Sequence, residues 1–356
     1  MQANVYYTEL ALTAQTAYAQ LQDVALAREL SKGLESLNGS FAQKTLNGKA
    51  YWYFAYRDLD SKVRQIYLGP SSEKLDALIE QAKLKKAQTK QNDQVDALVR
   101  SAAALGCSVG LPKHVRAIRR LSDYGFFKAG GVLVGTHAFA AMSNMLGVRW
   151  ASGESTTDVD FAHAGRNVSV ALPADIEIDV HEALTSFEAG FIPLVQLGGK
   201  SGASYKLRGD DEFQIDFLTS LTREGDKPVS IANLNISLQP LRFMEFSLEN
   251  VEQAVLFDRN GTSVMVNIPA PSRYAVHKLL IVGERSLRMR AKVNKDVQQS
   301  ACLIAWLLDH RVSDLKQSWQ SVLSRGPGWR GRLQEGYAAL KLAHPTLAAR
   351  LQPVIQ

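Results

Sequence analysis

Two short stretches of the sequence carry residues whose types and spacing could do chemistry. Gly135 and Thr136 separate the apolar run at 132–134 from a segment with helical character. A glycine at a strand-to-helix turn lets a phosphate approach the backbone N–H groups of the helix N-terminus, and the threonine hydroxyl adds a donor. Asp158 and Asp160 lie two apart in an expected strand, where alternation puts both carboxylates on one face. Together the stretches predict a phosphate cradle beside a site for Mg²⁺ or Mn²⁺.

A third carboxylate usually completes such a pair in two-metal phosphoryl transfer, because it helps to activate the attacking hydroxyl. Two residues compete for this role. Asp216 lies in the strand-like segment 213–218, on the face opposite three apolar side chains. Asp179 lies among apolar residues that recur at helical spacing, which places it on a polar helix face. We therefore expect Asp216 to complete the site, while a solvated strand aspartate is the simpler alternative.

The elements that must position these residues follow from hydrophobic periodicity. The middle of the chain alternates short strands with a helix, which predicts an α+β core. Beyond residue 269 the spacing becomes helical throughout and predicts a C-terminal bundle. The expected core strands are 132–134, 158–161, 205–207 and 213–218, the core helix is 137–146, and the C-terminal helices include 274–282, 293–308 and 312–323.

The N-terminal third has a different pattern. Residues 9–37 have helical spacing and predict one long helix or two short ones. Residues 51–68 alternate around a polar turn at 57–61 and predict an aromatic β-hairpin, followed by a helix with a lysine-rich face near 83–90. The aromatic rings could stack on nucleobases, although packing against the next helix is the interpretation we favour. The expected domains are 1–110, 111–268 and 269–356.

Composition and charge exclude several classes of protein. Hydrophobic residues make up 46% and charged residues 21% of the 356-residue chain, which excludes a mainly disordered protein. The net charge of +6 is compatible with a polyanionic partner and does not require one. Cys107 and Cys302 lie far apart, which argues against a disulfide framework or a cysteine zinc site. No apolar stretch approaches the roughly 20 residues of a membrane span, so we expect a cytoplasmic protein without a membrane partner.

The motifs carry a resemblance to a known superfamily. The Gly-Thr turn, the Asp-Val-Asp strand and the Gln-Ile-Asp-Phe strand at 214–217 resemble the pattern of the DNA polymerase β-like nucleotidyltransferases. More narrowly, the hairpin at 51–70, the helical signature at 271–280 and Lys295-Asp296 are similar to bacterial nucleotidyltransferase-domain proteins related to the AbiE-type toxins. The resemblance implies a mixed-sheet core, an N-terminal helix and β-hairpin region, and a C-terminal helical bundle.

The resemblance also implies a reaction. An NTP such as ATP would give its nucleoside monophosphate to the hydroxyl of an acceptor, an RNA or tRNA end or a protein, with release of pyrophosphate. Mg²⁺ or Mn²⁺ would be required, and the resemblance is compatible with an antitoxin-like partner protein without requiring one. By position, the catalytic and metal-binding residues would be Asp158, Asp160 and Asp216, and the residues that bind the NTP would be Gly135, Thr136 and Lys278.

Several alternatives stay open. A non-catalytic nucleic-acid or protein binding module on a nucleotidyltransferase-like core would use the aromatic hairpin and the lysine-rich helix as its surface. A glycosyltransferase with an Asp-x-Asp motif would need parallel strands before the motif, where this chain has helices and a hairpin. His137 is more typical of a local hydrogen-bonding residue than of a phosphate ligand. Lys295 and Asp296 are either an active-site pair or an ion pair on a helix surface.

Overall fold

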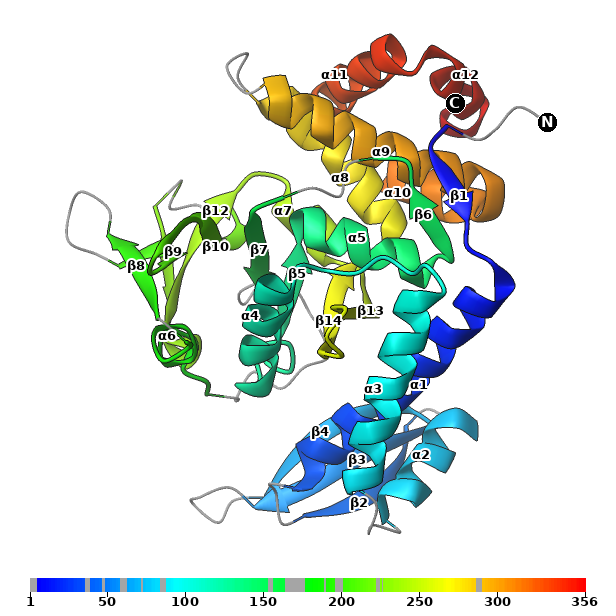
Figure 1. The fold of residues 1–356 in the computed structure, drawn as a ribbon. Coiled ribbons are helices and arrows are strands. Elements are labelled where there is room, and N and C mark those ends of the chain that lie inside the picture. Colours follow the sequence, from blue (N-terminus) through cyan, green and yellow to red (C-terminus); the bar gives the residue numbers. More distant parts are fainter. Residues whose placement is uncertain are drawn as a thin grey trace.

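The computed structural model describes residues 5–35, 39–46, 49–57, 63–71, 73–83, 88–152, 156–163, 177–188, 190–195, 201–221, 225, 227–285 and 290–356. These residues form an N-terminal region, a central sheet and a set of C-terminal helices (Figure 1). The α+β class is therefore confirmed. Residues 58–61 of the expected hairpin turn and residues 84–87 of the lysine-rich helix lie outside the described residues.

The N-terminal region combines helices with a three-stranded antiparallel sheet. β3 (Lys49–Arg57) pairs with β4 (Val63–Pro70), which confirms the predicted hairpin, and β2 (Gly39–Leu46) pairs with the other edge of β3. The sequence analysis missed β2 because its residues show no clear alternation. Trp52 of β3 donates from Nε1 to Asp76 at 2.6 Å, which supports packing against the following helix. The helices of this region are α1 (Leu12–Glu35), α2 (Glu73–Lys83) and α3 (Gln88–Ala104).

A seven-stranded mixed sheet lies at the centre of the molecule. Its order is β11-β12-β10-β7-β5, with β9 paired to β10 and β8 paired to β9. β10 runs parallel to β7 and to β12, and the other pairings are antiparallel. The mixed sheet expected from the resemblance is thus confirmed. The strands are β5 (Gly131–Val134), β7 (Asp158–His163), β8 (Phe191–Val195), β9 (Ser201–Leu207), β10 (Asp210–Ser220), β11 (Val229–Ile231) and β12 (Ile236–Leu241).

The two faces of this sheet have different coverings. On one face Phe161 and Phe217 stack with centroids 5.5 Å apart, and Phe213 packs against His114 of α4 (Pro112–Asp123). On the other face, apolar side chains of β5 and β7 pack against α7 (Met244–Leu248). Because side chains alternate along a strand, the even-numbered aspartates of β7 and β10 share the face that α7 partly covers.

Smaller elements tie the N-terminal region to the core. β1 (Tyr7–Glu9) pairs with β6 (Val148–Trp150), and α5 (Gly135–Met145) precedes β6. Tyr18 of α1 accepts a bond from the Val255 N–H at 2.9 Å, so α1 lies against the hairpin of β13 (Val251–Phe257) and β14 (Ser263–Pro269). The division at residues 110 and 268 stays a prediction. The remaining short helices of the core are α6 (Val180–Thr185) and the 3₁₀ turn Ala232–Leu234.

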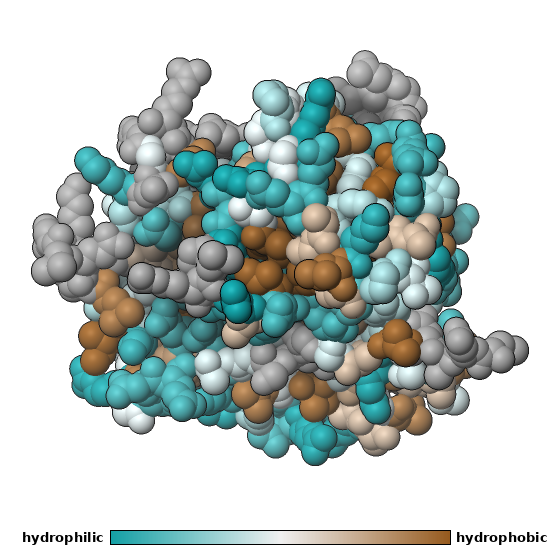
Figure 2. Space-filling view, turned by 90° about the horizontal axis from the view of Figure 1, so that it is seen from above, coloured by the Kyte–Doolittle hydropathy of each residue, from teal (hydrophilic) through white to brown (hydrophobic). Residues whose placement is uncertain are grey.

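The C-terminal part is helical, as the periodicity predicted, and prolines begin three of its helices. A proline fits the first turn of a helix because its missing N–H would have no partner there. No helix in the described part of the chain combines the length and the apolar character of a membrane span. Seen from above in Figure 2, hydrophilic residues cover most of the surface, with smaller hydrophobic groups between them. The helices are α8 (Pro271–Glu284), α9 (Arg290–His310), α10 (Val312–Leu323), α11 (Pro327–Ala343) and α12 (Pro345–Ile355).

Close contact between α8 and α11 predicts a specific sensitivity to one glycine. A Cβ built at Gly336 would lie 2.1 Å from the backbone oxygen of Leu279, so Gly336→Ala forces the two helices apart. We expect a loss of about 1–3 kcal/mol in the free energy of unfolding, measured by chemical denaturation. At Gly331 of the same helix a Cβ would meet no atom within 4 Å, so Gly331→Ala should be neutral or stabilising by up to about 1 kcal/mol. Equal effects of the two substitutions would contradict this close contact.

Candidate active site

Parallel pairing of β7 with β10 brings the three predicted carboxylates together. In this register Asp160 lies opposite Asp216, and Asp158 lies opposite Gln214. Neighbouring strands are roughly 5 Å apart, so the Cα atoms of Asp160 and Asp216 are about that far from each other. Asp158 is two residues before Asp160 and shares its face. The sequence alone placed Asp158 and Asp160 on one face of a strand, and the pairing of β7 with β10 brings Asp216 next to them.

Gly135 lies directly against this carboxylate cluster. β5 is antiparallel to β7 and pairs Val134 with Asp160, so the turn that follows β5 starts beside Asp160. Gly135 has φ +61°, a conformation that favours glycine. A Cβ at this position would lie 2.1 Å from Oδ2 of Asp160. Only glycine therefore lets the start of α5 approach the carboxylate, and this is why the predicted cradle and the predicted metal site meet.

The electrostatics of the cluster show the cost of this arrangement. Burial, and after it the neighbouring carboxylates of Asp216 and Asp158, raise the pKa of Asp160 from 3.8 to about 6. The positive charges of Lys278 and Lys292 act in the opposite direction. Like charges held near one another disfavour the ionised form of each, so the cluster favours the arrival of a positive charge.

Neighbouring polar groups hold the carboxylate of Asp216. Ser204 of β9 donates its hydroxyl proton to Oδ1 of Asp216, and Gln214 donates from Nε2 to the same oxygen at 2.8 Å. The competing residue, Asp179, is instead the N-cap of α6 and accepts a bond from the Glu182 N–H at 2.7 Å. Asp179 is thus occupied at a helix start, and the structure places Asp216 with the Asp158 and Asp160 pair.

Lys278 of α8 is buried near the cluster and is already paired. Its Nζ donates to Asp296 at 2.7 Å, and Nε of Arg285 donates to the other oxygen of Asp296 at 2.6 Å. Burial acts to lower the pKa of Lys278, but Tyr274 and Asp296 raise it above its ordinary value, so the ammonium stays charged. Asp296 is therefore a partner of Lys278 and Arg285, in the protein interior, and not one half of a surface pair.

The first turns of α9 add positive charge to the same region. Lys295 is half-buried, and burial together with Lys278 lowers its pKa, while Asp160, Asp296 and Asp158 act to raise it. Lys292, one turn earlier, is exposed and stabilises the ionised form of Asp160. The sequence analysis singled out Lys295 but missed Lys292. A lysine repeated one helical turn before a residue of interest is the signal that could have indicated it.

Two buried polar residues of the C-terminal helices contact the turn, and the sequence analysis missed both. The hydroxyl of Tyr274 donates to the backbone oxygen of Gly135 at 2.8 Å and lies 2.9 Å from Oε1 of Gln299. Nε2 of Gln299 in turn donates to the hydroxyl oxygen of Thr136 at 3.4 Å. Tyr274 and Gln299 are almost fully buried. A polar residue on an otherwise apolar helix face is the sequence signal for such a role.

Thr136 and His137 are both buried at the start of α5. Thr136 is 6% exposed, so its hydroxyl faces the protein interior around Gln299. His137 lies with Nε2 3.0 Å from Nδ1 of His114. Burial lowers the pKa of His137 to about 3 and that of His114 to about 4, so both rings are neutral at physiological pH. This arrangement agrees with a local hydrogen-bonding role for His137.

Comparisons with known proteins identify the family. A sequence profile of the family described as Nucleotidyltransferase matches residues 112–324, which is more than half of the chain. The chain therefore belongs to this nucleotidyltransferase family, in agreement with the superfamily that the motifs resemble. No curated protein matches the chain in sequence.

A solved structure is also similar to this chain. An antigenic nucleotidyltransferase-like protein from Paracoccidioides brasiliensis is 16% identical, over 63% of this chain and 94% of its own, with a TM-score of 0.28. Because this TM-score is low, no residue and no activity is transferred from that protein.

The residues of the cluster fit a divalent cation by their chemistry. Proteins of this family typically use an NTP and a divalent metal ion. Within the described residues, no three His, Cys, Asp or Glu side chains are grouped as a ready metal site. The donor set is nevertheless suitable, because Asp158, Asp160 and Asp216 offer oxygen ligands from one sheet face and repel one another without a cation.

The raised pKa of Asp160 predicts how pH affects the metal-free protein. A carboxyl whose pKa rises from 3.8 to about 6 on folding stabilises the folded state below pH 4 and loses that contribution as the pH rises through 6. Asn cannot ionise, so in the presence of EDTA Asp160→Asn should increase the free energy of unfolding at pH 7.5 by about 2–3 kcal/mol and raise the Tm accordingly. At pH 4 the substitution should leave both nearly unchanged.

Thermal unfolding of Asp160→Asn and of the unmodified protein between pH 4 and pH 7.5 measures their difference in stability. Asp211→Asn removes an exposed carboxylate from the neighbouring strand β10 and is the control, whose stability should differ little from that of the unmodified protein at every pH. A stability difference for Asp160→Asn that does not vary with pH would show that Asp160 is not the titrating group.

Proposed function

We propose that this protein transfers a nucleoside monophosphate from an NTP to an acceptor hydroxyl and releases pyrophosphate. The observation that carries the proposal is the parallel pairing that sets Asp216 beside Asp160, with Gly135 packed against the Asp160 carboxylate. This arrangement joins candidate metal ligands and a candidate phosphate site in one place. Membership of the nucleotidyltransferase family supports the reaction class.

Asp158, Asp160 and Asp216 are the residues that would hold Mg²⁺ or Mn²⁺. When bound, such ions polarise the α-phosphate and lower the pKa of the attacking hydroxyl. Ser204 and Gln214 both donate to Oδ1 of Asp216, which orients this carboxylate. Oδ2 of Asp216 accepts neither of these bonds, and we assign it the proton of the acceptor hydroxyl.

The reaction that follows is a displacement at phosphorus. The acceptor oxygen forms a bond to the α-phosphorus, and the bond between the α-phosphorus and its bridging oxygen to the β-phosphate breaks. The electron pair leaves with pyrophosphate, and the hydroxyl proton goes to Asp216. Catalysis of this kind consists mainly of positioning and charge stabilisation, which the rigid pairing of β7 with β10 supports.

The triphosphate is assigned to the start of α5. Gly135 and Thr136 begin this 11-residue helix, and the N-cap residue, Val134, offers no side-chain hydrogen bond to its first N–H groups. Uncapped N–H groups and the helix dipole both attract a phosphate. Lys278 adds positive charge, part of which Asp296 offsets, and Lys292 adds charge from α9. The buried hydroxyl of Thr136 orients the turn through Gln299, which is a positioning role rather than the direct phosphate contact expected from the sequence.

The proposed acceptor is defined by its chemical class. A hydroxyl at an RNA or tRNA end, or on a protein, satisfies the same chemistry. The relationship to AbiE-type toxins and an antitoxin-like partner stay predictions from the resemblance, and a cytoplasmic location stays a prediction from the composition of the sequence.

The decisive experiment is transfer of radiolabel from each of the four NTPs, labelled at the α-phosphate, into bulk tRNA and into total cell protein. With Mg²⁺ or Mn²⁺ present, we expect label in one acceptor fraction and none with Asp158→Ala/Asp160→Ala. Label in one fraction names both the donor NTP and the acceptor class. Absence of transfer with every NTP and both metals, together with absence of NTP binding, would overturn the proposal in favour of a binding module.

The contact between Tyr274 and Gly135 predicts a positioning effect on this transfer. Tyr274→Phe removes the hydroxyl that holds the Gly135 carbonyl, so the turn loses its fixed position against Asp160. We expect the kcat/KM for the NTP to fall about tenfold or more, with a loss of about 1–2 kcal/mol in stability.

A matched control separates activity from stability. Ser318 donates its hydroxyl proton to Ser272 at 2.9 Å in the buried contact between α10 and α8. Ser318→Ala should cost a similar amount of stability and leave kcat/KM nearly unchanged. If both variants lower kcat/KM equally, Tyr274 acts only through stability.

A further inference from the structure

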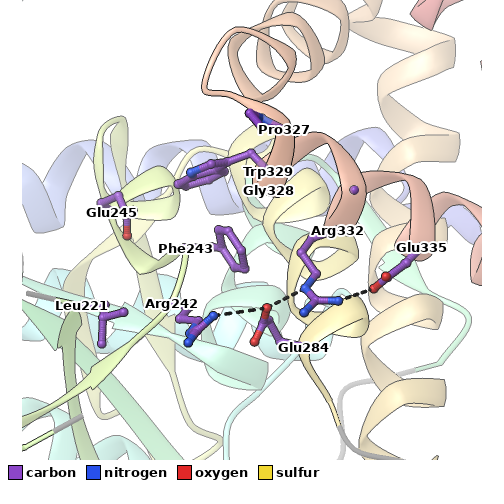
Figure 3. A pocket seen from close by; sticks show the side chains of 11 residues that line it. Leu221, Arg242, Phe243, Glu245, Glu284, Pro327, Gly328, Trp329, Arg332 and Glu335 are labelled. Carbon is purple, nitrogen blue, oxygen red and sulfur yellow. Dashed lines mark hydrogen bonds and ion pairs between the residues drawn. The ribbon is translucent and has the colours of Figure 1, made fainter. Parts of the chain in front are cut away.

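A cavity of about 530 Å³ lies where the end of β10 meets α7, α8 and α11 (Figure 3). Leu221 follows β10, Phe243 precedes α7, and Glu284 is the last residue of α8. Trp329 and Gly331 line it from α11. Small-molecule sites in proteins typically measure about 300–1,000 Å³, so the cavity has room for a ligand of nucleoside size.

Charged groups of both signs surround this cavity. Arg332 donates from Nε to Glu284 at 2.6 Å and from a terminal nitrogen to Glu335 at 2.8 Å. Arg242 lies 4.0 Å from Glu284, and its side chain is 60% exposed. Figure 3 shows the two guanidinium groups reaching Glu284 from opposite sides. A cation would meet the arginines and an anion would meet the carboxylates, so a neutral ligand with both donors and acceptors fits this lining best.

Apolar rings form another part of the lining. Phe243 and Trp329 pack edge to face with their ring centroids 4.6 Å apart, and Leu221 lines the cavity beside them. Such surfaces favour a flat ligand, because a planar ring buries much area without losing torsional freedom. The lining thus combines what a heteroaromatic ring requires, namely apolar contact on its faces and polar partners at its edge.

Glu245 supplies an acceptor that lacks a donor. Its Oε2 is buried and has no hydrogen-bond partner among the residues that the structure describes, and burial raises the pKa of this carboxyl. A buried acceptor without a donor costs roughly 1–3 kcal/mol, which an N–H group of a ligand would remove. In Figure 3 Glu245 borders the cavity on the side of Leu221.

We propose that this cavity binds a nucleobase that carries an exocyclic amino group, as adenine, guanine and cytosine do. The amino group donates to Glu245, a ring acceptor receives a bond from Arg242, and the ring lies against Phe243 and Trp329. Uracil fits poorly, because its N3–H donor is flanked by two carbonyl oxygens, which would be held against the Glu245 carboxylate. The inference rests on the proposed function, in which both donor and acceptor can be nucleotides.

Two elements connect this cavity to the carboxylate cluster. β10 leads from Asp216 to Leu221, a path of about 17 Å at roughly 3.3 Å per residue. α8 leads from Lys278 to Glu284, a rise of about 9 Å at roughly 1.5 Å per residue. These lengths suit a nucleotide whose base lies in the cavity and whose phosphate extends toward the cluster. The base belongs either to the donor NTP or to the acceptor.

The first test is the binding of adenosine, guanosine, cytidine and uridine, measured by isothermal titration calorimetry. Nucleosides carry no phosphate, so their binding does not depend on the carboxylates or on transfer, and it succeeds or fails independently of the proposed function. We expect at least one amino-bearing nucleoside to bind about tenfold or more tightly than uridine. Absence of binding by all four nucleosides, or equal binding of uridine, would overturn the proposal.

Variants place this binding in the cavity. A Cβ at Gly331 meets no atom within 4 Å, so Gly331→Leu extends a side chain into the open space of the cavity and should abolish nucleoside binding. Gln334→Leu adds the same side chain to an exposed position of α11 outside the cavity and should leave binding unchanged. Glu245→Gln should weaken binding about tenfold or more while the Tm stays equal or rises, because it removes a buried charge. Binding that persists in Gly331→Leu would contradict the assignment.

Steady-state transfer assays identify the source of the base. A higher KM for the NTP in Gly331→Leu, with an unchanged KM for the acceptor, assigns the cavity to the donor. A higher KM for an RNA acceptor in Gly331→Leu, with an unchanged KM for the NTP, assigns the cavity to the acceptor. If neither KM changes although nucleoside binding is lost, the cavity does not serve this reaction and the inference fails.

Discussion

Repulsion between carboxylates on neighbouring parallel strands is the constraint on which the rest of this structure depends. Asp160 and Asp216 face each other across the β7 and β10 pairing, with Asp158 on the same face. Burial and this proximity raise the pKa of Asp160. A fold that keeps such groups together must balance them with positive charge nearby, and Lys278 and Lys292 of the C-terminal helices provide it. A bound cation would relieve this unfavourable contact.

The C-terminal helices consequently contribute side chains to the candidate site itself. Tyr274 holds the carbonyl of the turn at Gly135, and Gln299 contacts the following threonine. Lys278 brings a buried charge that needs its own counterion, which Asp296 supplies together with a bond from Arg285. Every one of these groups is buried or half-buried, so leaving any of them unpaired would be costly.

The aromatic residues of the N-terminal sheet could stack on nucleobases or pack in the protein interior. Tryptophan and tyrosine in a hairpin are suited to stacking on bases and equally suited to packing. Here Trp52 bonds to Asp76 of α2, and Phe54 is 3% exposed. Those contacts support a structural role for this face of the sheet. The structural features that suit a nucleobase lie instead in the cavity between α7, α8 and α11.

The sequence by itself determined the local features of this protein. The alternation of Asp158 with Asp160, the glycine turn after a buried run, four of the core strands (β5, β7, β9 and β10) and the C-terminal helices follow from interactions between residues near one another in the chain, whereas β8, β11 and β12 were not predicted. The local pattern also favoured Asp216 over Asp179, because Asp216 lies in a segment with strand alternation and Asp179 lies in a segment with helical spacing. These features could be predicted because backbone geometry and side-chain alternation do not depend on distant partners.

Only the tertiary structure decided what these features contact. The register that pairs Asp216 with Asp160, the pairing of Lys278 with Asp296 and the bond from Tyr274 to Gly135 all join residues far apart in sequence. So does the pairing of β2 with β3 in a segment that shows no alternation. Such contacts are selected by the packing of whole elements, in which many weak interactions compete, and no local pattern encodes which distant partner a buried polar group will find.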